Sequence, residues 1–177
     1  DFPELGEAGR ICDLGAGAGF PGLVLAAALP DARIDLLEAT GRKCEFMRRA
    51  IDRADLRNAA VVCERAELWA LGDGEGAYDL ATARAVARLS TLAELASPLL
   101  CDGGHLLAWK GRRDPDEEAE LERASAALGV EPLEIRWSGP YAGSEHRHLH
   151  LIRKSGPTPP GIPRRPGMAK KRPYGKR

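Results

Sequence analysis

The sequence has 177 residues, of which 44% are hydrophobic, and its 26 basic residues balance its 26 acidic ones. This length suffices for one α/β domain with its own core, and the longest apolar run, residues 23–29, is far too short to span a bilayer. No signal-peptide pattern opens the chain, and its four cysteines form no C-x-x-C pair, so we expect a cytoplasmic protein in a reducing compartment.

The first predicted strand, residues 10–12, leads into the glycine-rich turn 13–22, and the apolar residues 23–29 then open a helix. Strand, glycines and helix in this order are typical of the first turn of a nucleotide-binding βαβ unit. Gly15, Gly17 and Gly19 let the backbone approach a ligand closely, because no Cβ intrudes. The turn therefore predicts a cofactor site.

The spacing of these glycines favours S-adenosylmethionine over a dinucleotide as the cofactor. A dinucleotide fingerprint places its third glycine five residues after the first, where this chain has Phe20. The pattern is instead G-x-G-x-G, with Asp13 just before it and Glu38 at the end of the second predicted strand, 33–37. Glu38 suits two ribose hydroxyls, and carboxylates suit the cationic groups of S-adenosylmethionine. A nicotinamide cofactor and a turn that merely packs are the alternatives.

An amphipathic helix is predicted over residues 43–54, and a short buried strand over residues 59–63. A chain that leaves a parallel strand lies beside the ligand crevice. We therefore expect Glu67 to accept a hydrogen bond from an adenine amino group, and the N–H of Ala66 to meet the edge of the ring. A helix-capping role is the alternative for Glu67.

The fourth predicted strand is 78–84, followed by a helix over 89–98, a turn over 101–104 and a strand over 105–109. Asp114 is expected to cap the N-terminus of a helix that ends at Gly129. The last two predicted strands span residues 130–137 and 148–153. The order predicts a Rossmann-like, doubly wound α/β fold: a mostly parallel seven-stranded sheet with an antiparallel last strand. Arg84 and Lys110, at strand ends, are expected to hold cofactor or RNA phosphate; solvated surface charge is the alternative for both.

The charge is unevenly distributed along the chain. Residues 147–177 carry ten Lys and Arg and no acid, which leaves the preceding part with a net charge of about −10. From residue 156 onward the chain contains six prolines and four glycines. We therefore expect a domain over 1–155 and a disordered basic tail over 156–177 that meets a polyanion.

The residues after the fourth strand indicate which atom is methylated. Residues 82–88 read Thr-Ala-Arg-Ala-Val-Ala-Arg, without the Asn/Asp-Pro-Pro turn that serves exocyclic amines or the Cys that attacks C5 of pyrimidines. Guanine N7 carries no proton and needs neither a base nor a covalent intermediate. It needs only positioning and accommodation of charge, for which Arg84 and Lys110 are the candidate catalytic residues.

At this point the sequence resembles a known family. The strings DLGAGAGFPG, LLE, RAE, TARAVA, WKG and PRRPG are similar to those of the RsmG family, also called glucose-inhibited division protein B (GidB). The resemblance implies a class I methyltransferase that uses S-adenosylmethionine to methylate N7 of the guanosine conventionally numbered 527 in 16S ribosomal RNA. It implies cofactor contacts from Gly15, Phe20, Ala66, Glu67 and Arg84. Family members carry a helical segment before the first strand, so we expect this sequence to be a piece of a longer protein.

Three function hypotheses stay open. The first is the ribosomal RNA methyltransferase, acting as a monomer on 16S ribosomal RNA or the small ribosomal subunit. The others are a small-molecule methyltransferase and a non-catalytic RNA-binding assembly module. We expect no metal site: His146, His148 and His150 share a spacing that chelates zinc in principle, but an exposed strand face is the favoured interpretation.

Overall fold

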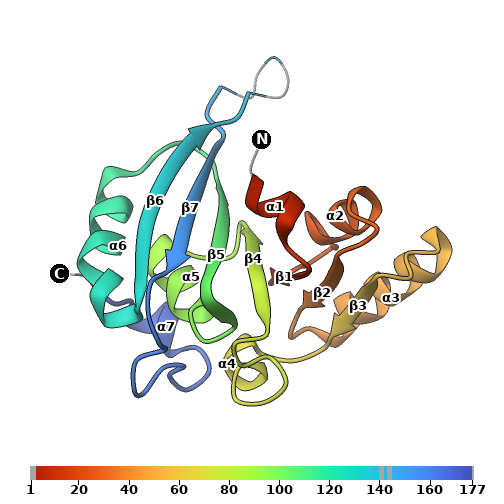
Figure 1. The fold of residues 1–177 in the computed structure, drawn as a ribbon, viewed down its shortest axis with the longest axis horizontal. Coiled ribbons are helices and arrows are strands. Elements are labelled where there is room, and N and C mark those ends of the chain that lie inside the picture. Colours follow the sequence, from red (N-terminus) through yellow and green to blue (C-terminus); the bar gives the residue numbers. More distant parts are fainter. Residues whose placement is uncertain (1–2, 140–141, 143–144, 177) are drawn as a thin grey trace.

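The computed structural model describes residues 3–139, 142 and 145–176. Its sheet has seven strands in the order β3-β2-β1-β4-β5-β7-β6 (Figure 1). Strands β1 to β5 run parallel, and β7 is antiparallel to both β5 and β6, so the predicted fold class is confirmed. The strands are β1 (Arg10–Leu14), β2 (Arg33–Leu37), β3 (Ala59–Val62), β4 (Tyr78–Arg84), β5 (Leu100–Lys110), β6 (Val130–Trp137) and β7 (His148–Lys154).

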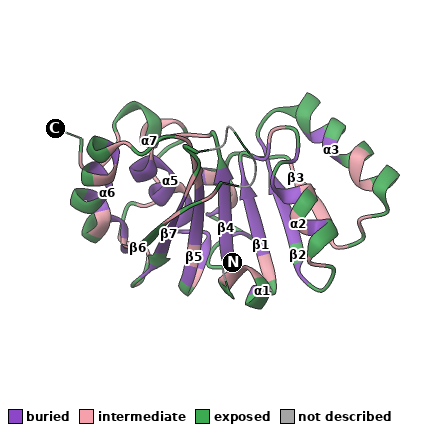
Figure 2. Cartoon of the chain, turned by 90° about the horizontal axis from the view of Figure 1, so that it is seen from above, coloured by how far each residue is buried: buried purple, intermediate pink, exposed green. Residues whose placement is uncertain are grey.

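Helices cover both faces of this sheet (Figure 2). Successive strand residues point to opposite faces, so Ile11 packs on the side of α1 and α2 while Cys12 packs on the side of α5 and α6. The resulting two-sided core is the doubly wound arrangement that the sequence predicts. The helices are α1 (Pro3–Glu7), α2 (Gly22–Ala28), α3 (Gly41–Ala54), α4 (Ala66–Trp69), α5 (Leu89–Ala96), α6 (Pro115–Leu128) and α7 (Met168–Lys171).

Helix α6 begins and ends where its sequence signals lie. The Asp114 side chain accepts hydrogen bonds from the N–H groups of Asp116 (3.0 Å) and Glu117 (3.2 Å), and Gly129 ends the helix with a left-handed φ of 65°. Such local chemistry explains why this helix was predictable.

Strand β5 is longer than the sequence predicts. It begins at Leu100 and includes Gly103 and Gly104, which we expected to form a turn. The pairing of β4 with β5 shifts register between Tyr78 and Leu80, so the irregular segment is accommodated within the sheet. Gly104 allows this because a Cβ there would lie 3.0 to 3.1 Å from backbone oxygens of both strands. The short helices α1, α4 and α7 were not predicted, since four or five residues carry no periodicity.

The C-terminal segment 156–176 differs from the expected disordered tail. In the structure it packs along α5 and α6: Arg164 Nε donates to the carboxylate of Glu94, which is only 1% exposed, and the Gly175 carbonyl accepts from Arg123 Nε (2.9 Å). Ala169 in α7 is buried. Composition could not reveal this packing, because the partners of the segment are buried acids on distant helices. The domain boundary at residue 155 stays a prediction.

Candidate functional site

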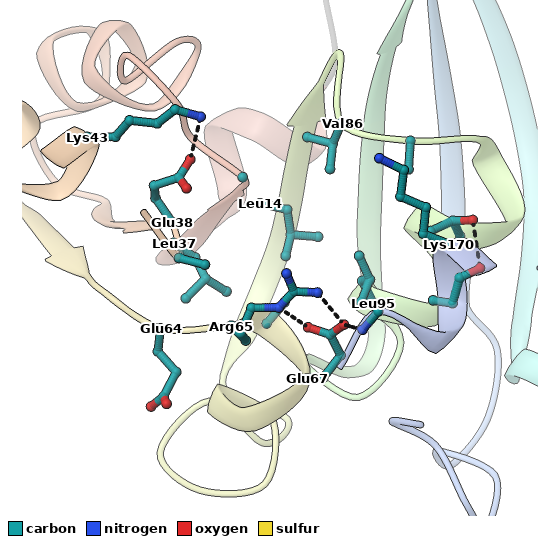
Figure 3. Close-up of a pocket in the computed structure, with 17 residues that line it drawn as sticks. Leu14, Leu37, Glu38, Lys43, Glu64, Arg65, Glu67, Val86, Leu95 and Lys170 are labelled. Carbon is teal, nitrogen blue, oxygen red and sulfur yellow. Dashed lines mark hydrogen bonds and ion pairs between the residues drawn. The ribbon is translucent and has the colours of Figure 1, made fainter. Parts of the chain in front are cut away.

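A cavity of about 380 Å³ opens where β1, β2 and β3 end, in the size range of ligand sites (Figure 3). This first cavity lies in the crevice at the carboxyl ends of the parallel strands, where open α/β sheets bind ligands. Its lining comes from five separate parts of the chain, within residues 14–15, 37–43, 64–67, 86–95 and 167–170: Leu14, Gly15, Leu37–Ala39, Lys43, Glu64–Glu67, Val86, Ala87, Thr91, Leu95, Gly167, Ala169 and Lys170.

The glycine-rich turn forms one wall of the first cavity. Gly15, Gly17 and Gly19 have φ angles of 66°, 61° and 89°, a backbone region that residues other than glycine rarely adopt. A Cβ at Gly15 would also lie 2.9 Å from a methyl carbon of Val86, whereas a Cβ at Gly17 would meet only a carbonyl oxygen at 3.7 Å. Gly15 therefore permits close packing. Gly17 has space around its Cα but does not line the first cavity, so its predicted contact with the cofactor stays a prediction.

Gly19 has a different role from the one predicted. A Cβ at this position would collide with Leu23 in α2, so its glycine is required for the packing of the turn on the helix. Gly19 does not line the first cavity. Its assignment as a cofactor contact therefore stays a prediction that the cavity lining does not support.

Glu38 lies in the first cavity as predicted. Its carboxylate accepts hydrogen bonds from the N–H groups of Thr40 (2.8 Å) and Gly17 (3.2 Å), and Lys43 Nζ lies 3.5 Å away. Burial alone would raise the pKa of Glu38, but these hydrogen bonds and the lysine charge lower it below its ordinary value. Glu38 is thus a fixed, ionised acceptor that also holds the glycine-rich turn in place.

Asp13 lies just behind the turn rather than in the cavity lining. Its Oδ2 accepts from the N–H of Gly22 at the start of α2 (2.8 Å), whereas its Oδ1 is buried and has no partner among the described residues. Burial raises the pKa of Asp13 to about 7, against the opposing effects of the Gly22 hydrogen bond and the Arg84 charge. An unpaired carboxylate oxygen here fits a ligand that brings a cationic group to the turn.

The far end of the first cavity is closed by Ala66 and Glu67. The Glu67 carboxylate accepts from Arg65 Nη2 (3.0 Å) and from the N–H of Gly167 (2.8 Å), which holds the C-terminal segment against α4 (Figure 3). Burial opposes ionisation of Glu67, but these two donors lower its pKa below the ordinary value. A carboxylate has about four acceptor positions, so Glu67 keeps room for one more donor.

The sequence analysis missed the contribution of the C-terminal segment to this site. Gly167, Ala169 and Lys170 line the first cavity, and the Ala169 carbonyl accepts from Thr91 Oγ1 of α5 (3.2 Å). No signal in the sequence indicates that this segment folds back across the domain. Lys43, Arg65 and Val86 were also missed, although each lies within a few residues of a predicted contact.

Phe20 and Arg84 lie together outside the first cavity. The Arg84 guanidinium is 5.7 Å from the centre of the Phe20 ring, which is 49% exposed. Among the described residues Arg84 has no ion pair. It lines a second cavity of about 510 Å³, formed by Arg84, Ala85, Ala87, Leu92, Trp109, Lys110, Gly111, Ser138, Arg147, His148 and Leu149.

Lys110 also lines the second cavity, but its ammonium group is already paired. Lys110 Nζ donates to Glu117 Oε1 (2.6 Å) and to the carbonyl of Ala87 (3.2 Å). The same carboxylate oxygen accepts from the N–H of Leu89 (2.6 Å). This arrangement gives Lys110 a role in fixing the loop after β4; its predicted contact with RNA phosphate or cofactor is untested.

The three histidines at the start of β7 do not act as a group. His146 Nε2 lies 3.3 Å from Arg112, His148 Nδ1 lies 2.9 Å from the carbonyl of Gly111, and His150 is buried. Within the part of the chain that the structure describes, no three His, Cys, Asp or Glu side chains come together as metal ligands. None of the described helices is long and apolar enough to cross a membrane.

The geometry therefore comprises a nucleotide-sized cavity at a glycine-rich turn and a second cavity beside it. Residues 2–149 match the protein-family model described as "GidB: rRNA small subunit methyltransferase G". The chain belongs to this family. The predicted family is thereby confirmed, and the description of its model names a small-subunit rRNA methyltransferase.

Individual members of the GidB family support the match. A ribosomal RNA small subunit methyltransferase G from Chloroflexus aggregans (strain MD-66 / DSM 9485) is 43% identical over 170 residues, which are 93% of this chain and 69% of that protein. The protein of that name from Synechococcus sp. (strain JA-2-3B'a(2-13)) is 39% identical over 167 residues, 94% of this chain and 64% of its own. The chain thus spans about two thirds of the length of these relatives.

A solved structure supports the fold independently of the GidB family. A SAM dependent methyltransferase from Aquifex aeolicus superposes with a TM-score of 0.62 over 81% of both chains, at 13% sequence identity. At that identity the likeness shows the fold alone.

Proposed function

We propose that this chain transfers the methyl group of S-adenosylmethionine to N7 of the guanosine conventionally numbered 527 in 16S ribosomal RNA. The observation that carries the proposal is the match of residues 2–149 to the family of small subunit rRNA methyltransferases. When bound, the cofactor supplies an electrophilic methyl group on a sulfonium centre.

The residues in and behind the first cavity suit the cofactor. Glu38 offers a fixed carboxylate to the two ribose hydroxyls, and Glu67 and the N–H of Ala66 suit the edge of an adenine ring. Asp13 lies behind the turn and outside the lining, and its unpaired Oδ1 suits a cationic group brought to the turn. Arg84, which has no ion pair among the described residues, suits a carboxylate or a phosphate at the opening beside Phe20.

The second cavity supports N7 as the methylated atom. Its described lining contains no carboxylate and no thiol, and Nδ1 of its one histidine, His148, is engaged with a backbone carbonyl. An exocyclic amine would need a proton acceptor, and a pyrimidine C5 would need a thiol nucleophile. Guanine N7 has a lone pair and no proton, so positioning and charge suffice.

We further propose that the chain acts in the cytoplasm as a monomer, with 16S ribosomal RNA or the small ribosomal subunit as its partner. A small-molecule methyltransferase would use the same first cavity, but it would not need the free cations around the second one. A non-catalytic RNA-binding module would bind RNA strongly and the cofactor weakly. Calorimetry with S-adenosylhomocysteine therefore distinguishes such a module from a methyltransferase.

The test is mass-spectrometric mapping of small-subunit RNA from cells that lack the gene for this protein. We expect 7-methylguanosine to disappear at the proposed position and to return when the wild-type gene is restored. Unchanged 7-methylguanosine at that position in the deletion strain would refute the proposed substrate.

A further inference from the structure

We propose that the second cavity is the subsite for the target guanosine nucleotide, with the base against Trp109, Leu92 and Leu149 and the 5′-phosphate on Arg147. The assignment rests on the proposed function, which names guanine as the methyl acceptor but does not say where the base lies. Four features of the second cavity carry it: its position, its wall, its charge and its shape.

The position of the second cavity places its occupant next to the cofactor site. Ala87 lines both cavities, so the two cavities adjoin at this residue. The second cavity also lies where β4 and β5 end and where the antiparallel β7 begins. Direct methyl transfer needs this proximity, because the reacting atoms must meet without a carrier.

The wall between the two cavities is a fixed loop. Residues 85–88 follow β4, and Ala85 has a left-handed φ of 57°, which is rare for a residue with a side chain. Lys110 and Glu117 hold this loop at the carbonyl of Ala87 and the N–H of Leu89. Strain that the surrounding contacts maintain is typical of functional sites, and here it fixes the boundary between cofactor and substrate.

The charge of the second cavity suits an anionic ligand. Among the residues that the structure describes, its lining includes three cations and no acidic residue. Lys110 is neutralised by Glu117, whereas the Arg84 and Arg147 side chains form no ion pair with any other described residue. Arg147 is exposed and thus lies at the rim, where an RNA phosphate can reach it. A guanidinium binds phosphate with two parallel hydrogen bonds.

The shape of the second cavity suits a nucleoside rather than a bare phosphate. A volume of about 510 Å³ is within the range of sites for small organic ligands. The half-buried Trp109, held by a hydrogen bond from its Nε1 to Thr82 Oγ1 (2.7 Å), and the buried Leu92 and Leu149 provide apolar surface for a flat base.

The free cations favour guanine over adenine. Guanine presents the acceptors O6 and N7 on its major-groove edge, whereas adenine presents an N6 amino donor there. An arginine beside this edge attracts O6 and repels an amino group. The subsite therefore distinguishes guanine from adenine through a hydrogen bond from an arginine to O6. This contact adds to the contact with the phosphate.

Two substitutions change the second cavity in different ways. Arg147→Ala removes the rim cation but keeps the backbone carbonyl that accepts from Ser138 N. Gly111→Leu fills space, because a Cβ at Gly111 meets nothing closer than an Arg147 nitrogen at 3.7 Å, so the backbone tolerates it while the side chain enters the cavity. Arg57→Ala is the matched control, since Arg57 precedes β3 at the opposite edge of the sheet and is exposed.

The experiment measures binding of guanosine 5′-monophosphate to the 177-residue chain by isothermal titration calorimetry, with S-adenosylhomocysteine present at saturation. We expect Arg147→Ala to weaken binding about 10-fold, as for the loss of one charge-assisted contact. Arg147→Lys should recover part of this loss, because an ammonium keeps the charge but lacks the planar fork. Gly111→Leu should weaken binding at least as much as Arg147→Ala, and Arg57→Ala should leave it unchanged.

Affinity for S-adenosylhomocysteine should stay within twofold of wild type in all four variants, which separates the two cavities. The subsite is refuted if wild type does not bind the nucleotide, or if Arg147→Ala and Gly111→Leu bind it as tightly as wild type does. A wild-type protein that binds the nucleotide here but leaves N7 of 16S ribosomal RNA unmethylated would refute the proposed function while keeping the subsite.

Discussion

The glycine-rich turn and the C-terminal segment 156–176 form opposite walls of the first cavity, and they are held in place in different ways. The turn is fixed within the first βαβ unit. Its glycines adopt left-handed φ angles, the Asp13 carboxylate accepts from the N–H of Gly22, and Glu38 at the end of β2 accepts from the N–H of Gly17. The segment is fixed by single contacts with distant elements, such as the hydrogen bond from the N–H of Gly167 to the Glu67 carboxylate. The turn is therefore encoded locally, and the segment depends on the completed fold.

This contrast predicts a larger loss of stability from Arg164→Ala in the segment than from Gly17→Val in the turn. Arg164 pairs with Glu94, which is almost fully buried, and its guanidinium also lies 4.2 Å from the centre of the Tyr174 ring. Arg164→Ala leaves a buried carboxylate without its partner, which typically costs about 3–5 kcal/mol.

The measurement is urea denaturation, with Arg165→Ala as the control because Arg165 is exposed. Equal midpoints for the two variants would mean that the segment is not docked through this pair. A large loss for Arg164→Ala alone would show that residues 156–176 belong to the folded domain.

Arg84 lines the second cavity, and its removal should affect catalysis rather than folding. It forms no ion pair among the described residues, so Arg84→Ala should cost little stability. We expect methyl transfer to fall by about 10-fold to 1000-fold, as for the loss of one preorganised donor. Arg84→Lys should restore part of the rate.

Single-turnover methyl transfer to 16S ribosomal RNA, at saturating cofactor, measures this effect. Arg57→Ala controls for a general loss of positive charge. A wild-type rate in folded Arg84→Ala would make Arg84 a surface charge at the end of β4. Since no proton has to leave N7, the rate at saturating cofactor should also show no required base near neutral pH.

A substitution in the turn should weaken cofactor binding. Gly17→Val puts a β-branched side chain at a φ of 61°, in the space that the turn leaves open, so affinity for S-adenosylhomocysteine should fall about 10-fold or more. Gly72→Val is a suitable control, because nothing lies within 4 Å of a Cβ at that position. The measurement is the affinity of both folded variants for S-adenosylhomocysteine by calorimetry. An unchanged affinity in Gly17→Val would exclude the turn from the cofactor site.

The smallest expected effect is the pH dependence that Asp13 gives the turn. Its pKa is about 7 in the folded chain, above the ordinary 3.8, so the folded state holds the proton more tightly than the unfolded one. The stabilisation is fully present below pH 3.8 and is lost as the pH rises towards 7. Between pH 6 and pH 7 the free energy of unfolding should fall by about 1 kcal/mol from this group.

Asp13→Asn should remove this contribution, because an amide does not titrate in this range. The comparison is the unfolding free energy of wild type and variant, measured by denaturant titration at pH 6 and pH 7. Parallel changes in the two proteins would mean that Asp13 does not carry the proton.

The same contrast explains what could be predicted from the sequence. Gly15, Glu38, Ala66 and Glu67, which the sequence predicts to share one site, all line the first cavity, because parallel strands bring their carboxyl ends to one edge of the sheet. Their contacts with the cofactor stay predictions. Helix α6 was predictable from its caps. These features depend on residues that are near in sequence or related by a repeated βα unit.

The remaining features depend on tertiary packing. The partner of Lys110 is Glu117 on α6, and the partner of Arg164 is Glu94 on α5; neither pair can be read from spacing. Gly167 and Lys170 enter the first cavity only because the segment crosses α5, although its Pro- and Gly-rich composition is typical of disorder. Charge counting identified a basic segment but could not show which of its charges are already paired.

The most direct test of the account is a crystal structure of the chain with S-adenosylhomocysteine. We predict the ribose hydroxyls on Glu38, the adenine ring beside Ala66, and the C-terminal segment in contact with the ligand through residues 167–170. Both walls of the first cavity would then touch the same molecule. A ligand bound away from Glu38, or a bound ligand with the segment displaced from the first cavity, would contradict the account.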